Sequence, residues 1–125
     1  MLAKINFDVL ALFTVLTIAV LSLVPENAVT GDIGKFDVVL HALAYALICA
    51  CAVIRRRTVW SALLMFASVV LFGFLIEFIQ PLFGRSLEFR DLVANIIGST
   101  TGLAAALAYK SATDPDWKRR STDVS

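Results

Sequence analysis

Apolar residues occur along the chain in four long runs, which are separated by short polar stretches. The runs cover residues 7–24, 36–54, 59–79 (or 80) and 91–109. Crossing the roughly 30 Å of hydrocarbon in a bilayer takes about 20 residues of helix, with a range of about 17–25. The pattern therefore predicts an all-α, integral membrane four-helix bundle whose short loops make neighbouring helices antiparallel.

Composition supports this interpretation and excludes one class of partner. Of the 125 residues, 59% are hydrophobic and 17% are charged, and the mean hydropathy is +0.84. Soluble chains are typically about 45–50% apolar, so lipid is the expected surrounding of most of this protein. The formal net charge of +1 gives no electrostatic argument for binding nucleic acid.

The two ends of the chain allow simple expectations. We expect residues 1–110 to form one transmembrane domain. The segment 111–125 is polar and has no helical apolar pattern, so we expect a disordered cytoplasmic tail. The first apolar run is longer than the 7–15 residues usual for the core of a signal peptide, which favours a retained helix.

Basic residues are distributed unevenly between the two sides of a four-span arrangement. Eight of the eleven fall on one side, and they are Lys4, Arg55, Arg56, Arg57, Lys110, Lys118, Arg119 and Arg120. Basic residues collect in cytoplasmic loops, so both termini and the loop 55–58 are expected to be cytoplasmic. A three-span arrangement would separate the arginine triplet from the basic tail, so the charge rule favours four spans.

Polar residues gather at the outer ends of three predicted helices. Asp37, His41 and Tyr45 follow one another at steps of four, which places them on one helix face. Glu77 lies four residues before the proline that ends the third run, and Asn95 lies four residues into the fourth. Because four helical residues rise about 6 Å, His41, Glu77 and Asn95 are expected at one level, a turn beneath the outer surface.

Further polar residues surround this level. Gln80 lies one turn above Glu77, while Asp37, Arg85, Arg90 and Asp91 are expected to form a ring at the outer surface. A buried carboxylate needs a partner, and Arg85 is a candidate partner for Glu77. Such residues can also cap helices or tie them together, so a structural clasp stays open as an alternative to a binding pocket.

Small residues form a separate pattern on the fourth run. Ala94, Gly98, Gly102 and Ala106 recur at steps of four, a spacing that lets two helices approach closely. Packing within one chain is favoured over dimerisation.

The chain offers few residues for metal or cofactor binding. Cys49 and Cys51 lie two positions apart in an apolar run, where we expect them to be inert filling residues. A single histidine with scattered acids is a poor metal site from sequence alone. No metal and no cofactor is therefore expected.

Together these residues resemble the VanZ-like family, small bacterial membrane proteins named for a teicoplanin-resistance factor. The resemblance runs from LSLVP (21–25) to about residue 108. DVVLHALAY (37–45) is similar to the family's Asp-Lys-x-x-His-x-x-x-Tyr, and EFIQ (77–80) to its Glu-x-x-Gln. GRSLEFRDLVANIIG (84–98) is similar to its Gly-Arg-Ser followed by Asp-x-x-Ala-Asn-x-x-Gly. The motif adds Ser86 to the candidate binding residues, which are Asp37, His41, Tyr45, Glu77, Gln80, Arg85, Ser86, Asp91 and Asn95.

One position departs from the family pattern. Val38 occupies the place of the family's lysine, and Lys35 is the nearest lysine. Whether Lys35 replaces the missing residue by snorkelling stays open. The resemblance implies a multi-pass protein of the bacterial cytoplasmic membrane that is linked to envelope antibiotic resistance, and it supplies no reaction.

Three functions are compatible with these observations. In the first, the pocket binds a lipid headgroup, a lipid-linked wall precursor or a lipoglycopeptide such as teicoplanin without catalysis, and Arg85 and Arg90 meet its anionic groups. In the second, the protein is an enzyme acting on a lipid-linked substrate through His41 with Glu77 or Asp91, although no known catalytic signature is present. A small multidrug-type transporter is less favoured, because residues 9–24 carry no charge.

Overall fold

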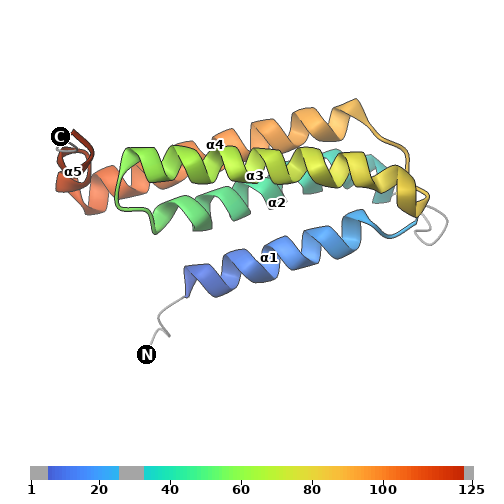
Figure 1. Cartoon of the computed structure of the whole chain (residues 1–125), viewed down its shortest axis with the longest axis horizontal. Helices are drawn as coiled ribbons and strands as arrows, with labels where there is room; N and C mark the ends of the chain where they lie inside the picture. Colours follow the sequence, from blue (N-terminus) through green and yellow to red (C-terminus); the bar gives the residue numbers. More distant parts are fainter. Residues whose placement is uncertain (1–5, 26–32, 123–125) are drawn as a thin grey trace.

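The computed structural model describes residues 6–25 and 33–122, and these residues are arranged as helices joined by short turns. Side chains are described from residue 37 to residue 120 and from residue 6 to residue 25. The helices are α1 (Phe7–Ser22), α2 (Ile33–Ile54), α3 (Val59–Ile79), η2 (Gln80–Phe83), α4 (Phe89–Thr113), η3 (Pro115–Trp117) and α5 (Arg119–Thr122). Figure 1 shows α2, α3 and α4 running side by side, with α1 alongside them.

Local sequence signals explain where α3 begins and ends. Thr58 caps its first turn: the Thr58 hydroxyl accepts from the Ser61 backbone N–H, and the Ser61 hydroxyl accepts from the Thr58 backbone N–H. At the other end Pro81 follows directly, and the chain tightens into η2. Gly84 then reverses the chain with a φ of 78°, a left-handed conformation that glycine adopts without strain.

Three helices are long and apolar enough to cross a membrane. They include the segments Asp37–Ile54, Val59–Phe83 and Phe89–Thr113. The remaining apolar run, residues 7–24, forms a helix too, but this helix, α1, has only 16 residues, which amounts to about 24 Å. Length alone therefore distinguishes α1 from the other three.

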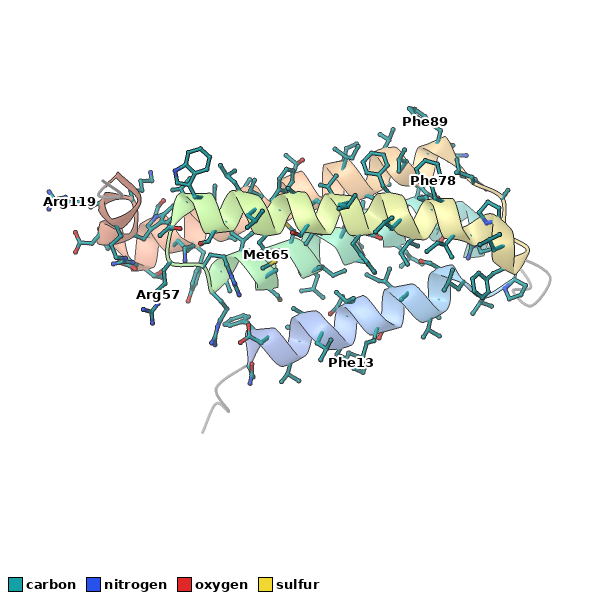
Figure 2. The ribbon with its side chains drawn as sticks, in the orientation of Figure 1. Phe13, Arg57, Met65, Phe78, Phe89 and Arg119 are labelled. Carbon is teal, nitrogen blue, oxygen red and sulfur yellow. The ribbon has the colours of Figure 1, made fainter. Side chains whose placement is uncertain are left out.

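The exterior of the bundle is apolar. Only 28–33% of each long apolar segment is buried inside the protein, and large side chains such as Phe13, Phe78 and Phe89 lie on the outside (Figure 2). An exposed apolar surface of this extent marks a site of contact with lipid or protein. The helical and apolar character predicted from the sequence is thus present, while no membrane side is assigned by the fold.

The closest packing is between α2 and α4, along the small-residue face of α4. A Cβ atom at Gly98 would lie 2.1 Å from the carbonyl oxygen of Ala42, and one at Gly102 would lie 2.2 Å from that of Ala46. Hydrogen is therefore the largest side chain that fits at either position. This face, formed by Ala94, Gly98, Gly102 and Ala106, packs within the chain.

The expectation of a disordered tail from residue 111 is wrong for the part that the structure describes. Helix α4 continues to Thr113 instead of ending near residue 109, and η3 and α5 follow it. The tail turns back because the Trp117 indole is buried, with the Lys110 ammonium 5.4 Å from the centre of its ring. The aromatic ring supplies the apolar contact that the polar sequence of the tail lacks elsewhere.

Candidate functional site

The predicted polar residues lie together at the end of the bundle where α2 begins, α3 ends and α4 begins, the right-hand end in Figure 1. We call this group the polar cluster. It comprises Asp37, His41, Tyr45, Glu77, Gln80, Arg85, Asp91 and Asn95. Six of them are buried, and Glu77 and Gln80 each have only 1% of their surface exposed. His41, Glu77 and Asn95, for which helix rise predicts one level, are all buried.

His41 connects two helices of the cluster. Its Nδ1 atom lies 2.9 Å from the backbone carbonyl oxygen of Asp37 and 3.2 Å from the Asp37 carboxylate. Its Nε2 atom lies 3.8 Å from Oε1 of Glu77, which reaches the histidine from α3. The step of four residues along α2 therefore does two things: it anchors one ring nitrogen and turns the other toward α3.

Arg85 forms the partly exposed mouth of the cluster together with Asp37. The guanidinium donates to Oδ2 of Asp37 at 2.9 Å and to the backbone carbonyl of Leu21, at the end of α1, at 3.4 Å. The sequence-based pairing of Arg85 with Glu77 is therefore replaced by a pairing with Asp37. The side chains of Arg85 and Asp37 keep 14% and 27% of their surface exposed, so this pair is more accessible than the six buried residues of the cluster.

Two of the predicted residues, Asp91 and Ser86, take other positions than expected. Asp91 was expected in the outer ring, but it is buried among the cluster residues with 2% of its surface exposed. Arg90, its neighbour, and Ser86 are exposed. The side chain of Lys35, proposed as a substitute for the family lysine at Val38, lies outside the described residues.

Glycine makes the inner part of the cluster possible. A Cβ atom at Gly73 would lie 3.1 Å from the Tyr45 ring and 3.2 Å from Nδ2 of Asn95. The bare backbone of α3 at this point lets side chains from α2 and α4 meet. Ser99, one turn below Asn95 on α4, is fully buried and extends the cluster inward. Ser99 was not among the candidate site residues, although its spacing of four residues from Asn95 places it on the same helix face.

Most polar atoms of the cluster have no hydrogen-bond partner within the part of the chain that the structure describes. These atoms are His41 Nε2, Tyr45 OH, both Glu77 oxygens, both side-chain polar atoms of Gln80 and of Asn95, Arg85 Nε, Asp91 Oδ1 and Ser99 Oγ. Leaving a buried donor or acceptor unsatisfied costs about 1–3 kcal/mol. A clasp that merely ties helices together would pair its own members, so this arrangement favours an external partner.

The charges of the cluster are unbalanced. Three carboxyl groups, from Asp37, Glu77 and Asp91, face one guanidinium, which is already paired with Asp37. Buried charges without partners are unfavourable in an apolar surrounding. The arrangement is therefore suited to a group that brings positive charge and hydrogen-bond donors to the carboxylates.

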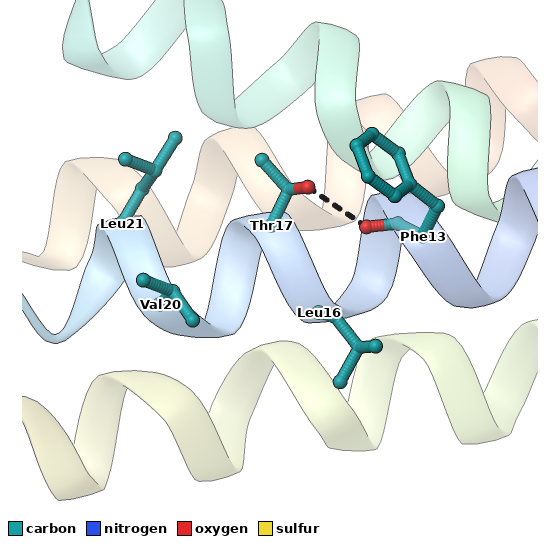
Figure 3. Close-up of a pocket in the computed structure, with 5 residues that line it drawn as sticks. All are labelled: Phe13, Leu16, Thr17, Val20 and Leu21. Carbon is teal, nitrogen blue, oxygen red and sulfur yellow. Dashed lines mark hydrogen bonds between the residues drawn. The ribbon is translucent and has the colours of Figure 1, made fainter.

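An apolar depression on α1 lacks comparable chemistry. It is lined by Phe13, Leu16, Thr17, Val20 and Leu21 (Figure 3). The single hydroxyl there, that of Thr17, donates to the carbonyl oxygen of Phe13 at 2.8 Å within the same helix. This surface offers shape and apolar contact, but no group to orient a polar ligand.

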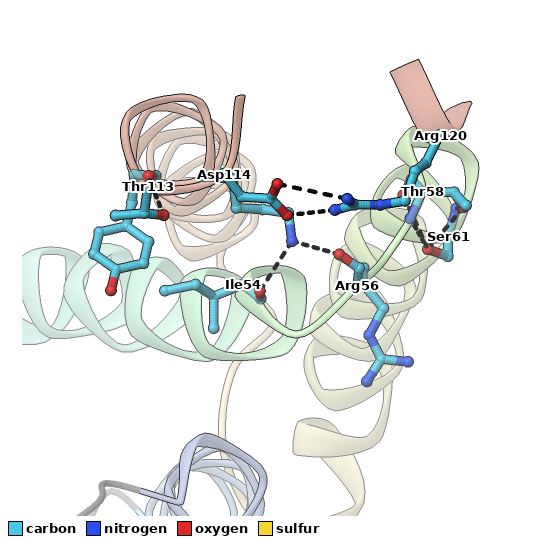
Figure 4. Close-up of polar contacts among 9 residues, drawn as sticks. Ile54, Arg56, Thr58, Ser61, Thr113, Asp114 and Arg120 are labelled. Carbon is cyan, nitrogen blue, oxygen red and sulfur yellow. Dashed lines mark hydrogen bonds and ion pairs between the residues drawn. The ribbon is translucent and has the colours of Figure 1, made fainter. Parts of the chain in front are cut away.

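Polar contacts at the opposite end of the bundle fasten helix ends (Figure 4). The Lys110 ammonium donates to the carbonyl oxygen of Ile54 at 3.0 Å, which the end of α2 leaves free, and to the carbonyl oxygen of Arg56 in the turn that follows. Arg120 donates to Asp114, and this hydrogen bond lowers the pKa of the Asp114 carboxyl. These residues satisfy one another, in contrast to the polar cluster.

Comparisons with protein-family models, with curated proteins and with solved structures gave no match to this chain.

Proposed function

We propose that this chain is a multi-pass membrane protein of the bacterial envelope whose polar cluster binds the polar head of a membrane amphiphile without catalysis. The observation that carries the proposal is the concentration of unpartnered, buried polar atoms at one end of a bundle with an apolar exterior. An amphiphile matches both features, because its tail stays against the apolar helices while its head enters the cluster.

The mouth of the cluster supports a headgroup that carries both signs of charge. Asp37 and Arg85 are the partly exposed pair, and a phosphate or carboxylate would compete with Asp37 for the guanidinium. An ammonium group would meet Glu77 and Asp91 below. The proposed ligand class is therefore a phospholipid headgroup, a lipid-linked wall precursor or a lipoglycopeptide, and the resemblance to VanZ-like proteins favours teicoplanin as the first antibiotic to test.

Binding is tested with the full chain in phosphatidylcholine nanodiscs. Native mass spectrometry would follow the retention of added phosphatidylethanolamine, undecaprenyl phosphate or teicoplanin. We expect retention of at least one of these ligands, and about a tenfold or greater loss in Glu77→Gln and Arg85→Gln, since each substitution removes a charge-assisted contact.

Matched controls come from the opposite end of the bundle. Arg57→Gln and Asp116→Asn change the same kinds of charge at exposed positions and should bind as the unaltered protein does. In cells, expression of the protein should raise tolerance to teicoplanin, and Glu77→Gln should remove this tolerance at an equal protein level. Equal retention of every ligand by all four variants would refute the proposal.

An enzyme acting on a lipid-linked substrate is the second candidate, favoured by the geometry of His41. One ring nitrogen is held by the backbone of α2 and the other is turned toward Glu77, 3.8 Å away. This is the arrangement in which an imidazole takes a proton from an attacking water. Incubation of the protein with undecaprenyl pyrophosphate or a glycerophospholipid would reveal turnover, and the enzyme hypothesis requires that His41→Ala abolishes it.

A further inference from the structure

The polar cluster contains the donor atoms of a metal site, although the sequence led us to expect none. Asp37, His41 and Asp91 each offer one ligand atom, and these atoms lie within 4.8 Å of one another. Ligands bound to one ion at about 2.0–2.2 Å lie roughly 3–4 Å apart. Binding one ion would therefore bring these side chains closer together.

A buried carboxylate from a third helix points into the same place. Glu77 has 1% of its surface exposed, and neither of its oxygens has a hydrogen-bond partner among the residues that the structure covers. Its Oε1 atom lies 3.8 Å from Nε2 of His41, which is a normal separation for two ligands of one ion. Helices α2, α3 and α4 therefore each contribute a donor.

The imidazole is oriented as metal-binding histidines are. Nδ1 of His41 lies 2.9 Å from the backbone carbonyl oxygen of Asp37, a position suited to an N–H donor. The lone pair then belongs to Nε2, which has no hydrogen-bond partner in the described part of the protein. Metal ligands are commonly fixed in this way by a carbonyl behind the ring.

Arg85 supports the carboxylate at the mouth from behind. It donates to Oδ2 of Asp37, while Oδ1 of Asp37 lies 3.2 Å from Nδ1 of His41, so this carboxylate helps to fix the ring. With Arg85 paired to Asp37, the carboxyl groups of Glu77 and Asp91 are buried, with 1% and 2% of their surface exposed. A divalent cation would balance the two charges that these groups carry when both are deprotonated.

We propose that His41, Glu77 and Asp91 hold a divalent transition-metal ion, with Asp37 orienting the imidazole from its Nδ1 side and with zinc as the ion of choice. Imidazole combined with carboxylates favours zinc or a similar ion over magnesium or calcium, which prefer ligands that are all oxygen. This inference goes beyond headgroup binding and does not depend on it.

The metal assay uses the full chain in a maltoside detergent, so no phosphate or amine headgroup is present. His41 is the chain's one histidine, so the affinity tag must contain no histidine. After treatment with a chelator and its removal, zinc is titrated calorimetrically and bound zinc is counted by elemental analysis. We expect one zinc per chain, and about a tenfold or greater loss of affinity in His41→Gln, Glu77→Gln and Asp91→Asn.

A measurement on the unaltered sequence avoids the risk that a variant fails to fold. With ¹⁵N-labelled histidine, the nitrogen spectrum contains one imidazole, and zinc should shift its Nε2 resonance while magnesium leaves it unchanged. Asp116→Asn is the control for a lost carboxylate outside the cluster. An unchanged imidazole at saturating zinc, or undiminished zinc binding in His41→Gln, would overturn the proposal; headgroup retention measured in chelator would still test the proposed function separately.

Discussion

Lys110 shows how one charged residue is accommodated in a largely apolar helix. Its ammonium donates to two carbonyl oxygens at the end of α2 and lies against the Trp117 ring. A lysine stem can cross apolar surface while its charge reaches polar groups. The polar carbonyls left free by one helix are thus satisfied by the side chain of another.

Replacing this lysine tests its contribution to stability. Lys110→Met keeps an unbranched side chain but leaves the carbonyls of Ile54 and Arg56 without their donor. We expect the free energy of unfolding to fall by about 1.5–3 kcal/mol, the range for hydrogen bonds from a charged group. Circular dichroism during titration with a denaturing detergent measures it, and Lys118→Met at an exposed position is the control. Equal stability of the two variants would contradict the assigned role.

Gln80 tests the opposite case, in which a polar side chain reduces stability. It is buried, and neither polar atom of its amide has a partner within the described residues. Gln80→Met keeps the length of the side chain and removes both polar atoms of the amide, so we expect the free energy of unfolding to rise by about 1 kcal/mol. We also expect weaker retention of the ligand. Leu82→Met, at an exposed neighbour, controls for the added methionine. A marked destabilisation by Gln80→Met would show that the amide has a structural partner.

Among the elements, α4 is the one whose sequence pattern and packing agree most closely. Its glycines meet backbone atoms of α2, so the two helices approach nearer than any side chain would permit. The same approach brings Asn95 and Asp91 beside the residues of α2 in the polar cluster. Helix packing and the geometry of the candidate site are therefore coupled.

Gly98→Ala separates helix propensity from packing. Alanine favours helix over glycine by about 1 kcal/mol, but its Cβ would lie 2.1 Å from the carbonyl oxygen of Ala42. Overpacking costs about 1–3 kcal/mol or more, so we expect a net fall in the free energy of unfolding. We also expect the cluster residues of α2 and α4 to lie further apart. Ala104→Ser, which also adds one heavy atom, is the control on the exposed face of α4. A Gly98→Ala protein as stable as the control would show that α2 and α4 are further apart than described.

At the scale of the whole molecule, the ends of the bundle differ in chemistry. One end holds the polar cluster with its unpartnered atoms, and the other holds most of the basic residues together with the helical turns η3 and α5 (Figures 1 and 4). The charge rule predicts that the basic end lies in the cytoplasm. On this prediction the polar cluster faces the outer side of the membrane, from which the proposed ligand would bind.

Orientation is measured with single cysteines in a protein whose Cys49 and Cys51 are replaced by alanine. A membrane-impermeant maleimide should label Ser86→Cys on intact cells, because the position is exposed at the end with the polar cluster. Ser111→Cys, at the basic end, should be labelled only after the membrane is opened. The reverse pattern would place the polar cluster in the cytoplasm and exclude capture of an external ligand.

The polar residues show most clearly which features of the candidate site could be predicted from the sequence. Helix periodicity and the break at Pro81 placed His41, Glu77 and Asn95 at one level, because rise per residue is a local property of a helix. The direction in which each side chain points is not set by neighbouring residues of the same helix. Asp91 turns into the interior and Arg85 selects Asp37, since these choices depend on how three helices are rotated and spaced.

By itself the sequence determined the helical class, the apolar exterior, the small-residue face and the gathering of polar groups at one end of three helices, because solvent preference and periodicity act along neighbouring residues. Only the tertiary structure decided which acids gather around the one imidazole, that α1 is shorter than the other three apolar helices, and that Trp117 folds the tail against Lys110. These features arise between residues far apart in the chain, where packing geometry selects the partners.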